Sequence, residues 1–229
     1  MINERPLLTI RRDFPRPDGP SVRRFSGAAT VHLADAMDGR GALDYQIKPI
    51  NPAATAFTGT ALTCHSGPDD ALAILAAFEI AQPGDVIIAA TEAFKGSAVV
   101  GDLFAAMAVT AGVTAIVTDG LARDCDGIID TGLPVFASGV SPNSAAQSGP
   151  GTIGLPIVIN NVRVAPGDVV VGDRDGVIVV PQENLDQVYE QLQAVRAAES
   201  SYPTGPDGEV RVPQRVRDLL ASDQVHYLS

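Results

Sequence analysis

Two short apolar runs, separated by a helical segment, constrain the fold more than any other feature of this sequence. Residues 85–91 (DVIIAAT) and 113–118 (VTAIVT) are mostly apolar, which is typical of strands buried on both faces. Between them, residues 102–112 (DLFAAMAVTAG) indicate a helix that ends at Gly112. A strand, a helix and a second strand in this order are typical of parallel neighbours in one sheet. We therefore expect a mixed α/β domain with a layered architecture.

The 229 residues divide into an expected central domain and two terminal arms. Residues 1–25 form the first arm, in which five arginines between positions 11 and 24 alternate with prolines, so we expect an extended segment. It would pack on its own or a neighbouring subunit; binding of RNA or of an acidic protein is the alternative. Residues 26–200 hold the domain, and residues 201–229 form a second arm with polar turns and a short helix.

Further elements follow from periodicity and turn residues. We expect a helix with Thr30 as its N-cap, a strand over 56–66, a helix of about three turns within 68–85, a short strand within 133–142, antiparallel hairpins within 148–181 and an amphipathic helix over 183–200. The DRDG segment, residues 173–176, is most economically a hairpin turn.

Charge and composition exclude several classes of protein. The net charge of −11 argues against general nucleic-acid binding, which needs clustered Lys and Arg. The two cysteines do not suggest a disulfide framework, so we expect a reduced, cytoplasmic compartment. The longest apolar stretch, residues 103–117, is too short to span a bilayer and is interrupted by Gly112. No phosphate-binding or dinucleotide-binding glycine motif is present, and the serines lack a paired base for a hydrolase triad.

The loops that follow the two apolar strands carry the candidate chemistry. Asp102 lies after the first strand, and Arg123 and Asp124 lie after the second. If the strands are parallel neighbours, these loops meet at the carboxyl edge of the sheet, where α/β proteins bind ligands. Asp102 and Asp124 offer hard oxygen ligands for Mg²⁺ or Mn²⁺, and Arg123 offers a planar fork for a carboxylate or a developing enolate oxygen.

The start of the helical segment adds a possible anion site. Free backbone amides around Leu103 and Phe104 can hold a carboxylate, and Gly101 would let the backbone approach it closely. A simpler interpretation stays open, in which Asp102 only caps its helix and Arg123 with Asp124 forms a local surface ion pair.

Residues 101–124, GDLFAAMAVTAGVTAIVTDGLARD, resemble the signature of the class II pyruvate aldolases. These enzymes cleave 4-hydroxy-4-methyl-2-oxoglutarate and 4-carboxy-4-hydroxy-2-oxoadipate, and they share their fold with the regulator of ribonuclease activity A (the RraA-like superfamily). Supporting segments, such as AQPGDVIIAA and APGDVVVGDRDGVIVVP, extend the resemblance over about residues 26–200.

The resemblance implies an α/β/β/α sandwich, akin to swivelling phosphohistidine domains and assembled as a trimer or hexamer. It implies that Asp124 anchors the divalent metal, that Asp102 acts on it through water, and that Arg123 contacts the pyruvyl oxygens. Amides near Leu103 and Phe104 would hold the substrate carboxylate. Glu199, from a neighbouring subunit, is the matching candidate for a further acid at the metal.

The implied reaction is metal-dependent retro-aldol cleavage of a 4-hydroxy-2-oxo mono- or dicarboxylic acid to pyruvate, with oxaloacetate decarboxylation as a side activity. Three alternatives are weighed against it. A non-catalytic regulator would bind a protein such as a ribonuclease, but regulators of that type tend to lack the acid after the arginine. A Schiff-base aldolase would need a buried lysine, for which Lys95 is the candidate. A methyltransferase finds no support, because no glycine-rich motif for S-adenosylmethionine follows a first strand.

Overall fold

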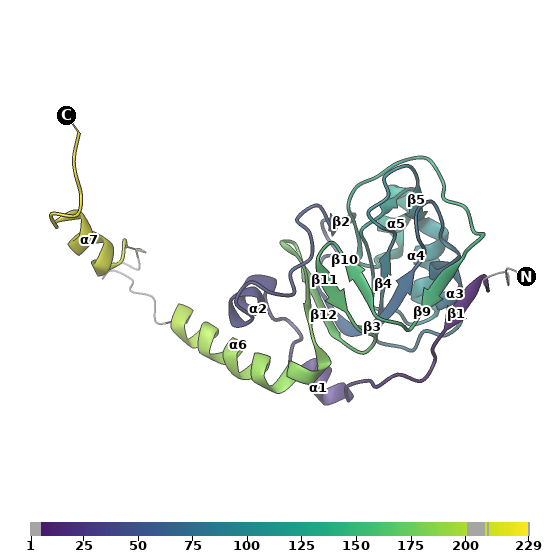
Figure 1. Cartoon of the computed structure of the whole chain (residues 1–229), viewed down its shortest axis with the longest axis horizontal. Helices are drawn as coiled ribbons and strands as arrows, with labels where there is room; N and C mark the ends of the chain where they lie inside the picture. Colours follow the sequence, from purple (N-terminus) through teal and green to yellow (C-terminus); the bar gives the residue numbers. More distant parts are fainter. Residues whose placement is uncertain (1–5, 201–208, 210, 229) are drawn as a thin grey trace, which may run out of the picture.

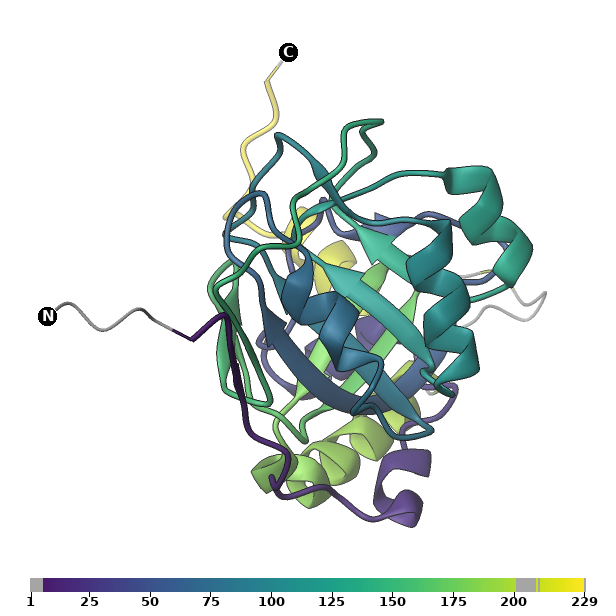
Figure 2. The same ribbon diagram turned by 90° about the vertical axis from the view of Figure 1, so that its right-hand side faces the viewer.

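The computed structural model describes residues 6–200, 209 and 211–228, and its helices and strands form layers (Figure 1). The helices are α1 (Gly19–Arg23), α2 (Thr30–Ala36), α3 (Leu72–Ala77), α4 (Asp102–Thr110), α5 (Cys125–Thr131), α6 (Leu185–Ser200) and α7 (Gln214–Leu220), with a 3₁₀ turn η1 (Gln182–Asn184) before α6. In Figure 1, α2 and α6 lie on one side of the strands and α3, α4 and α5 on the other. Seen from that second side, these three helices cover the strands (Figure 2).

The large sheet holds most of the strands of the described chain. Its members are β1 (Leu8–Ile10), β2 (Lys48–Pro49), β3 (Phe57–His65), β4 (Asp85–Ala90), β6 (Ala115–Thr118), β8 (Val135–Ala137), β9 (Gly151–Ile153), β12 (Val169–Asp173) and β13 (Gly176–Val180). Two small sheets pair β5 (Ala98–Val100) with β7 (Leu121–Ala122) and β10 (Ile157–Ile159) with β11 (Val162–Val164).

The strands β3, β4, β6 and β8 lie side by side and are parallel, and the pairing of β4 with β6 is the one that the two apolar runs predicted. Thr60 pairs with Asp85, Val86 pairs with Ala115, and the pairing continues from β6 to β8. The long strand β3 also pairs with β12 along its first half and with β9 along its last two residues, antiparallel in both cases. This double pairing turns the sheet back over itself and produces two strand layers.

Three apolar clusters separate the four layers. In β4, Ile87 belongs to the cluster under α3, α4 and α5, whereas the next residue, Ile88, faces the central cluster between the strand layers. In β12, Val170 faces that central cluster, and Val171 faces the cluster under α2 and α6. Because successive side chains of a strand point to opposite faces, β4 and β12 each contribute apolar side chains to two clusters. The α/β/β/α order confirms the expected fold class.

The DRDG segment forms the expected hairpin turn, and it has a second role. Asp173 pairs with Gly176 across the β12–β13 turn, and its carboxylate accepts hydrogen bonds from the Thr30 amide, at 2.8 Å, and the Thr30 hydroxyl, at 2.7 Å. Our prediction of Thr30 as the N-cap of α2 is therefore wrong. Ala29 is the N-cap and makes no side-chain cap. Asp173, remote in sequence, satisfies the first amide instead.

One predicted helix is shorter than expected, and one predicted strand lies where expected. The helix within 68–85 is only the six residues of α3, since Asp70 accepts hydrogen bonds from the backbone of Ser148 and Gly149 before the helix starts. The short strand predicted within 133–142 is confirmed as β8, which ends at Ala137. The residues beyond it pack along β7 instead, because Ser141 donates its amide to the Ala122 carbonyl, at 2.9 Å.

The described part of the N-terminal arm packs on its own chain. β1 adds to the sheet edge beside β9, and α1 forms where Asp18 accepts a hydrogen bond from the Ser21 amide. Arg16 forms an ion pair with the buried carboxylate of Asp85. Not all of this segment is extended, because α1 is helical. Among the described residues, no helix is long and apolar enough to cross a membrane.

Candidate active site

A two-stranded sheet brings the two predicted loops together. β5 precedes Gly101 and β7 precedes Arg123, and the two strands pair in parallel, Ala98 with Leu121 and Val100 with Ala122. The Arg123 amide then donates to the Val100 carbonyl, at 2.9 Å. Residues more than twenty positions apart in the sequence are therefore held side by side by backbone hydrogen bonds.

One pocket of about 130 Å³ contains six of the seven residues predicted for the site. Its lining includes Gly101, Asp102, Leu103, Phe104, Arg123 and Asp124, with Ala71, Ala98, Val99, Val100, Ser144, Ala145 and Gln147 around them. The pocket lies where α4 begins, beyond the carboxyl ends of β4 and β6. This is the edge at which α/β sheets bind ligands.

Asp124 has an unusual backbone conformation. Its φ of 54° and ψ of 46° place it in the left-handed region, which Asp tolerates better than most residues. It stands at the N-cap of α5, yet its side chain makes no cap hydrogen bond. One carboxylate oxygen, Oδ2, instead accepts a hydrogen bond from Arg123 Nε, at 2.9 Å. Strained backbone at a pocket wall is typical of functional positions, and here it turns the carboxylate towards the arginine instead of the helix.

The Arg123–Asp124 contact is the local ion pair that the simpler interpretation predicted. Both side chains are more than a third exposed, so the pair by itself contributes little to stability. The hydrogen bond and the charge of Asp124, with the charge of Asp102, raise the pKa of Arg123. The guanidinium is therefore fully charged and has five N–H donors, of which Asp124 uses only the Nε one.

Two glycines make room for the two carboxylates. A Cβ on Gly101 would lie 2.8 Å from Asp124 Oδ2, and a Cβ on Gly127 would lie 2.6 Å from the Cβ of Asp102 and 2.9 Å from its Oδ2. Our sequence analysis identified Gly101 but missed Gly127. Its signal was its position three residues after Asp124 in a helix, which places it on the side of α5 that packs on α4.

The start of α4 carries the predicted amides, and one of them is already engaged. Leu103 donates its backbone N–H to Oδ1 of Asp102, at 2.7 Å. Asp102 therefore has the capping contact of the simpler interpretation, although the N-cap of α4 is Gly101. A substrate carboxylate would take this amide only if Asp102 released it. Leu103 is 68% exposed, so this end of the pocket is open to solvent.

The residues present suit a divalent cation that keeps several water ligands better than one whose ligands all come from the protein. The described part of the chain has no group of three or more His, Cys, Asp or Glu side chains that could hold a metal. Two carboxylates, Asp102 and Asp124, line the pocket, and the glycines opposite them leave space. Mg²⁺ keeps several waters and binds through one or two carboxylates, so this donor set suits Mg²⁺ or Mn²⁺.

Glu199 is the one predicted site residue that this chain does not bring to the pocket. It lies near the end of α6, where its carboxylate pairs with His32 of α2, on the opposite side of the strands from α4 and α5 (Figure 1). The prediction assigned it to the site of a neighbouring subunit, so its role stays a prediction.

Lys95, the candidate for Schiff-base chemistry, does not line this pocket. Its ammonium donates to the Asp119 carbonyl, at 2.7 Å, and to the Ser138 hydroxyl. Burial lowers the pKa of Lys95, against the raising effect of the Asp119 and Asp44 charges. The direction of this shift is the one that Schiff-base chemistry requires, but Lys95 does not have a position beside the other candidate groups.

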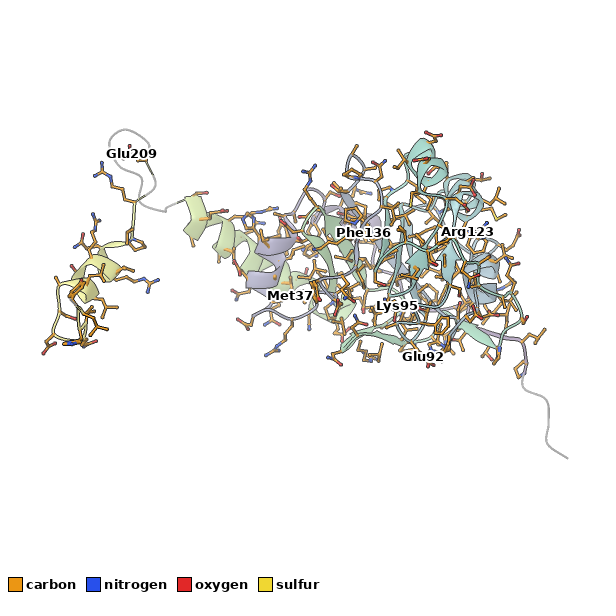
Figure 3. The ribbon with its side chains drawn as sticks, turned by 90° about the horizontal axis from the view of Figure 1, so that it is seen from above. Met37, Glu92, Lys95, Arg123, Phe136 and Glu209 are labelled. Carbon is orange, nitrogen blue, oxygen red and sulfur yellow. The ribbon has the colours of Figure 1, made fainter. Side chains whose placement is uncertain are left out.

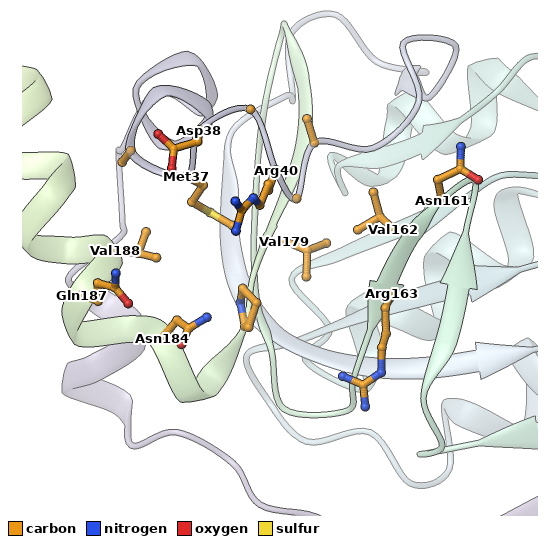
Figure 4. A pocket seen from close by; sticks show the side chains of 15 residues that line it. Met37, Asp38, Arg40, Asn161, Val162, Arg163, Val179, Asn184, Gln187 and Val188 are labelled. Carbon is orange, nitrogen blue, oxygen red and sulfur yellow. The ribbon is translucent and has the colours of Figure 1, made fainter.

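A larger cavity, of about 540 Å³, lies elsewhere, between α2, β13, β11 and the start of α6 (Figure 4). Met37, Arg40, Arg163 and Asn184 are among its lining residues. Met37 and Arg123 are well separated across the domain (Figure 3). Left-handed backbone occurs there too, at Asp38 and Asn161, but Asp38 is the one acid among its described lining residues, so no pair of carboxylates is present. We therefore place the candidate active site in the smaller pocket.

Comparisons with known proteins identify the family and the fold of the chain. Residues 30–179 match the RraA-like family, described as Aldolase/RraA. A protein of Halalkalibacterium halodurans named "Putative 4-hydroxy-4-methyl-2-oxoglutarate aldolase" is 34% identical over 176 residues, which cover 77% of this chain and 83% of that protein.

Two solved structures have the same fold over most of their length. An uncharacterized protein from Pseudomonas syringae superimposes with a TM-score of 0.72 at 26% identity and covers 82% of this chain and 92% of its own. Streptomyces coelicolor RraAS2, described as an unusual member of the RNase ES inhibitor RraA protein family, superimposes with a TM-score of 0.69 at 28% identity, covering 81% and 97%.

Proposed function

The chain belongs to the RraA-like family, and from that premise we propose that it is a divalent-metal-dependent aldolase. It would cleave a 4-hydroxy-2-oxo acid to pyruvate and a second carbonyl compound. The observation that carries this proposal is the convergence of Asp102, Arg123, Asp124 and the first turn of α4 on one small pocket. A regulator that acts only through its surface has no need for such a pocket.

The substrate's pyruvyl end would bind against Arg123 and the start of α4. Arg123 Nε is held by Asp124, so the terminal nitrogens of the guanidinium are left to donate to the pyruvyl oxygens. The amides of Leu103 and Phe104, in the first turn of α4, have the orientation to receive the carboxylate once Asp102 releases Leu103.

Asp124, with Asp102 through water, would hold Mg²⁺ or Mn²⁺, which supplies positive charge at the 2-oxo oxygen. Asp102 then takes up, through a water, the proton of the 4-hydroxyl group. The C3–C4 bond breaks, C4 becomes a carbonyl carbon, and the electron pair moves into the pyruvate enolate. Arg123 stabilises the negative charge that develops there, and return of a proton to C3 completes pyruvate. Oxaloacetate would lose CO₂ through the same enolate, so we expect decarboxylation as a side activity.

Assembly as a trimer or hexamer belongs to the same proposal. The α6 helix leaves Glu199 partly exposed near its end, with a side chain that is 65% accessible. A neighbouring subunit could receive that carboxylate beside its Asp124. This would bring the acids at the site to three and would make the active site dependent on the oligomer.

The test is pyruvate release from 4-hydroxy-2-oxo acids and oxaloacetate, with Mg²⁺ and after EDTA treatment. Asp124→Asn is the informative variant, because Asn also tolerates the left-handed backbone that Ala would strain. We expect kcat/KM to fall at least about a hundredfold, since the lost charge stabilisation is about 3 kcal/mol. The exposed Asp130→Asn, in the last turn of the same helix, is the matched control and should retain activity. Near-normal turnover in Asp124→Asn would refute the assignment.

Two rival functions predict different results. A regulator that binds a ribonuclease, the function suggested by the description of the Streptomyces coelicolor relative, would release no pyruvate from any of these acids. A Schiff-base aldolase would be indifferent to EDTA, and borohydride would trap pyruvate covalently on Lys95. We expect EDTA sensitivity and no trapping.

A further inference from the structure

We propose that the cavity between α2, β13, β11 and the start of α6 binds an organic dianion, that is, a small molecule that carries two carboxylate or two phosphate groups. The inference is independent of the proposed function, because this cavity shares no lining residue with the pocket around Asp124. Its volume of about 540 Å³ lies within the range that is typical of small-molecule sites in proteins, about 300–1,000 Å³.

Two arginines line the cavity from different segments. Arg40 follows α2, and Arg163 lies in β11 (Figure 4). Both are exposed, and neither guanidinium has a hydrogen bond or an ion pair with another described residue. A guanidinium binds a carboxylate or a phosphate through two parallel hydrogen bonds. Because the two arginines come from separate walls, each can hold one anionic group of a ligand that has two.

The acidic side chains around the cavity do not neutralise these arginines. Asp38 is the one acid among the described lining residues. Arg163 also interacts electrostatically with the buried Asp168, but that carboxylate already accepts hydrogen bonds from the amides of Ala165, at 2.8 Å, and Gln182, at 3.0 Å. Three exposed acids of the adjacent elements do not line the cavity: Asp35, Glu183 and Asp186. The lining, with two arginines and one aspartate, is therefore positive in a chain whose net charge is −11.

The other lining residues suit a small ligand that is rich in oxygen. The side-chain amides of Asn161, Asn184 and Gln187 each offer donors and an acceptor for hydroxyl or carbonyl groups. Val179 and Val188 are buried and add an apolar surface for the carbon skeleton of the ligand. A few polar groups around an apolar surface are the usual composition of a small-molecule site.

The backbone holds the wall that carries Arg40 in place. Gly39 and Gly41, on either side of it, have φ values of 77° and 78°, which glycine adopts without strain. The Gly41 carbonyl accepts a hydrogen bond from the Val179 amide, at 2.8 Å, and a Cβ on Gly41 would lie only 2.4 Å from the Val179 carbonyl oxygen. The segment therefore lies directly against β13. A wall that is already ordered reduces the entropy that ligand binding costs.

Isothermal calorimetry with two dianions tests the inference. Glutarate carries two carboxylates, fructose 1,6-bisphosphate carries two phosphates, and fructose is the uncharged control. We expect at least one dianion to bind once per chain with a Kd below about 1 mM, and we expect no binding of fructose. The dianion that binds more tightly identifies whether carboxylates or phosphates are preferred.

Neutral substitutions locate the bound dianion. Arg40→Gln and Arg163→Gln should each raise the Kd at least about tenfold, because each removes charge-assisted hydrogen bonds. Arg12→Gln removes the same charge from an exposed position outside the cavity and should leave the Kd unchanged. Arg123→Gln, in the candidate active site, should also leave it unchanged.

Three results would overturn the inference. The first is that neither dianion binds. The second is an equal rise in Kd for Arg12→Gln and Arg40→Gln, which would show an effect of overall charge alone. The third is binding that is lost in Arg123→Gln and retained in Arg40→Gln, which would place the anion in the candidate active site.

Discussion

Replacing Gly101 by alanine tests whether the space beside the Asp124 carboxylate is needed for function. The backbone of Gly101 is extended, with a φ of −137°, so alanine adds no backbone strain. Its Cβ, however, would lie 2.8 Å from Asp124 Oδ2 and 3.4 Å from Arg123 Cγ. Side chains do not remain so close to an oxygen atom. The carboxylate therefore has to move, and its hydrogen bond to Arg123 has to change with it.

The size of the effect follows from the displacement. An ordinary contact between carbon and oxygen is about 3.4 Å, so the carboxylate must shift by about half an ångström. A misplacement of about 1 Å can cost about a hundredfold in rate, and we expect about a tenfold fall in kcat/KM for Gly101→Ala. Stability should hardly change, because alanine reduces the entropy of the unfolded chain, which is worth about 0.4–1 kcal/mol and opposes the cost of the contact.

Two measurements on the same variant separate function from folding. Pyruvate release gives kcat/KM, and isothermal calorimetry with Mn²⁺ gives the affinity for the cation, which should weaken in parallel. Urea denaturation gives the free energy of unfolding, which should stay within about 1 kcal/mol of the wild type. A folded Gly101→Ala protein with unchanged turnover and unchanged Mn²⁺ affinity would refute the role given to this space and to Asp124.

The remaining predictions concern stability. Phe136 is fully buried between the strand layers, and the centroid of its ring lies 5.3 Å from that of Phe57. Phe136→Ala should therefore lower the free energy of unfolding, measured by urea titration, by about 3–5 kcal/mol. A loss below about 1 kcal/mol would contradict this packing. For Asp173, burial raises the pKa, but hydrogen bonds from Thr30 and the following turn outweigh it, and the folded pKa lies below the ordinary 3.8. Its stabilising effect is thus present above that value and lost as the pH falls through the folded pKa. The stability difference between wild type and Asp173→Asn should be constant near neutral pH and should shrink as the pH falls below 3.8 through the folded pKa, and a difference that stays constant in that acidic range would exclude this account.

Much of the fold was predictable because a strand that is buried on both faces has an apolar sequence, which can be recognised within its own short segment. β4 and β6 must face apolar clusters on both sides, so their sequences are apolar without alternation, and the helix between them makes them parallel. Turn residues located the β12–β13 hairpin in the same way. The residues that cap helix N-termini were less predictable. The Thr30 amide at the start of α2 donates to Asp173, and nothing near Thr30 in the sequence identifies Asp173 as its partner.

The same distinction between local and long-range information applies to the candidate site. By itself, the sequence determined which residues are candidates for the chemistry, since Asp102, Arg123 and Asp124 follow two strands whose parallel pairing could be inferred from their own composition. Only the tertiary structure decided that β5 and β7 pair and that Gly127 makes room for Asp102. The physical reason is the range of the interactions. Burial and turn preferences act on neighbouring residues, whereas the shape and charge of a pocket depend on contacts between segments that meet only after the chain has folded.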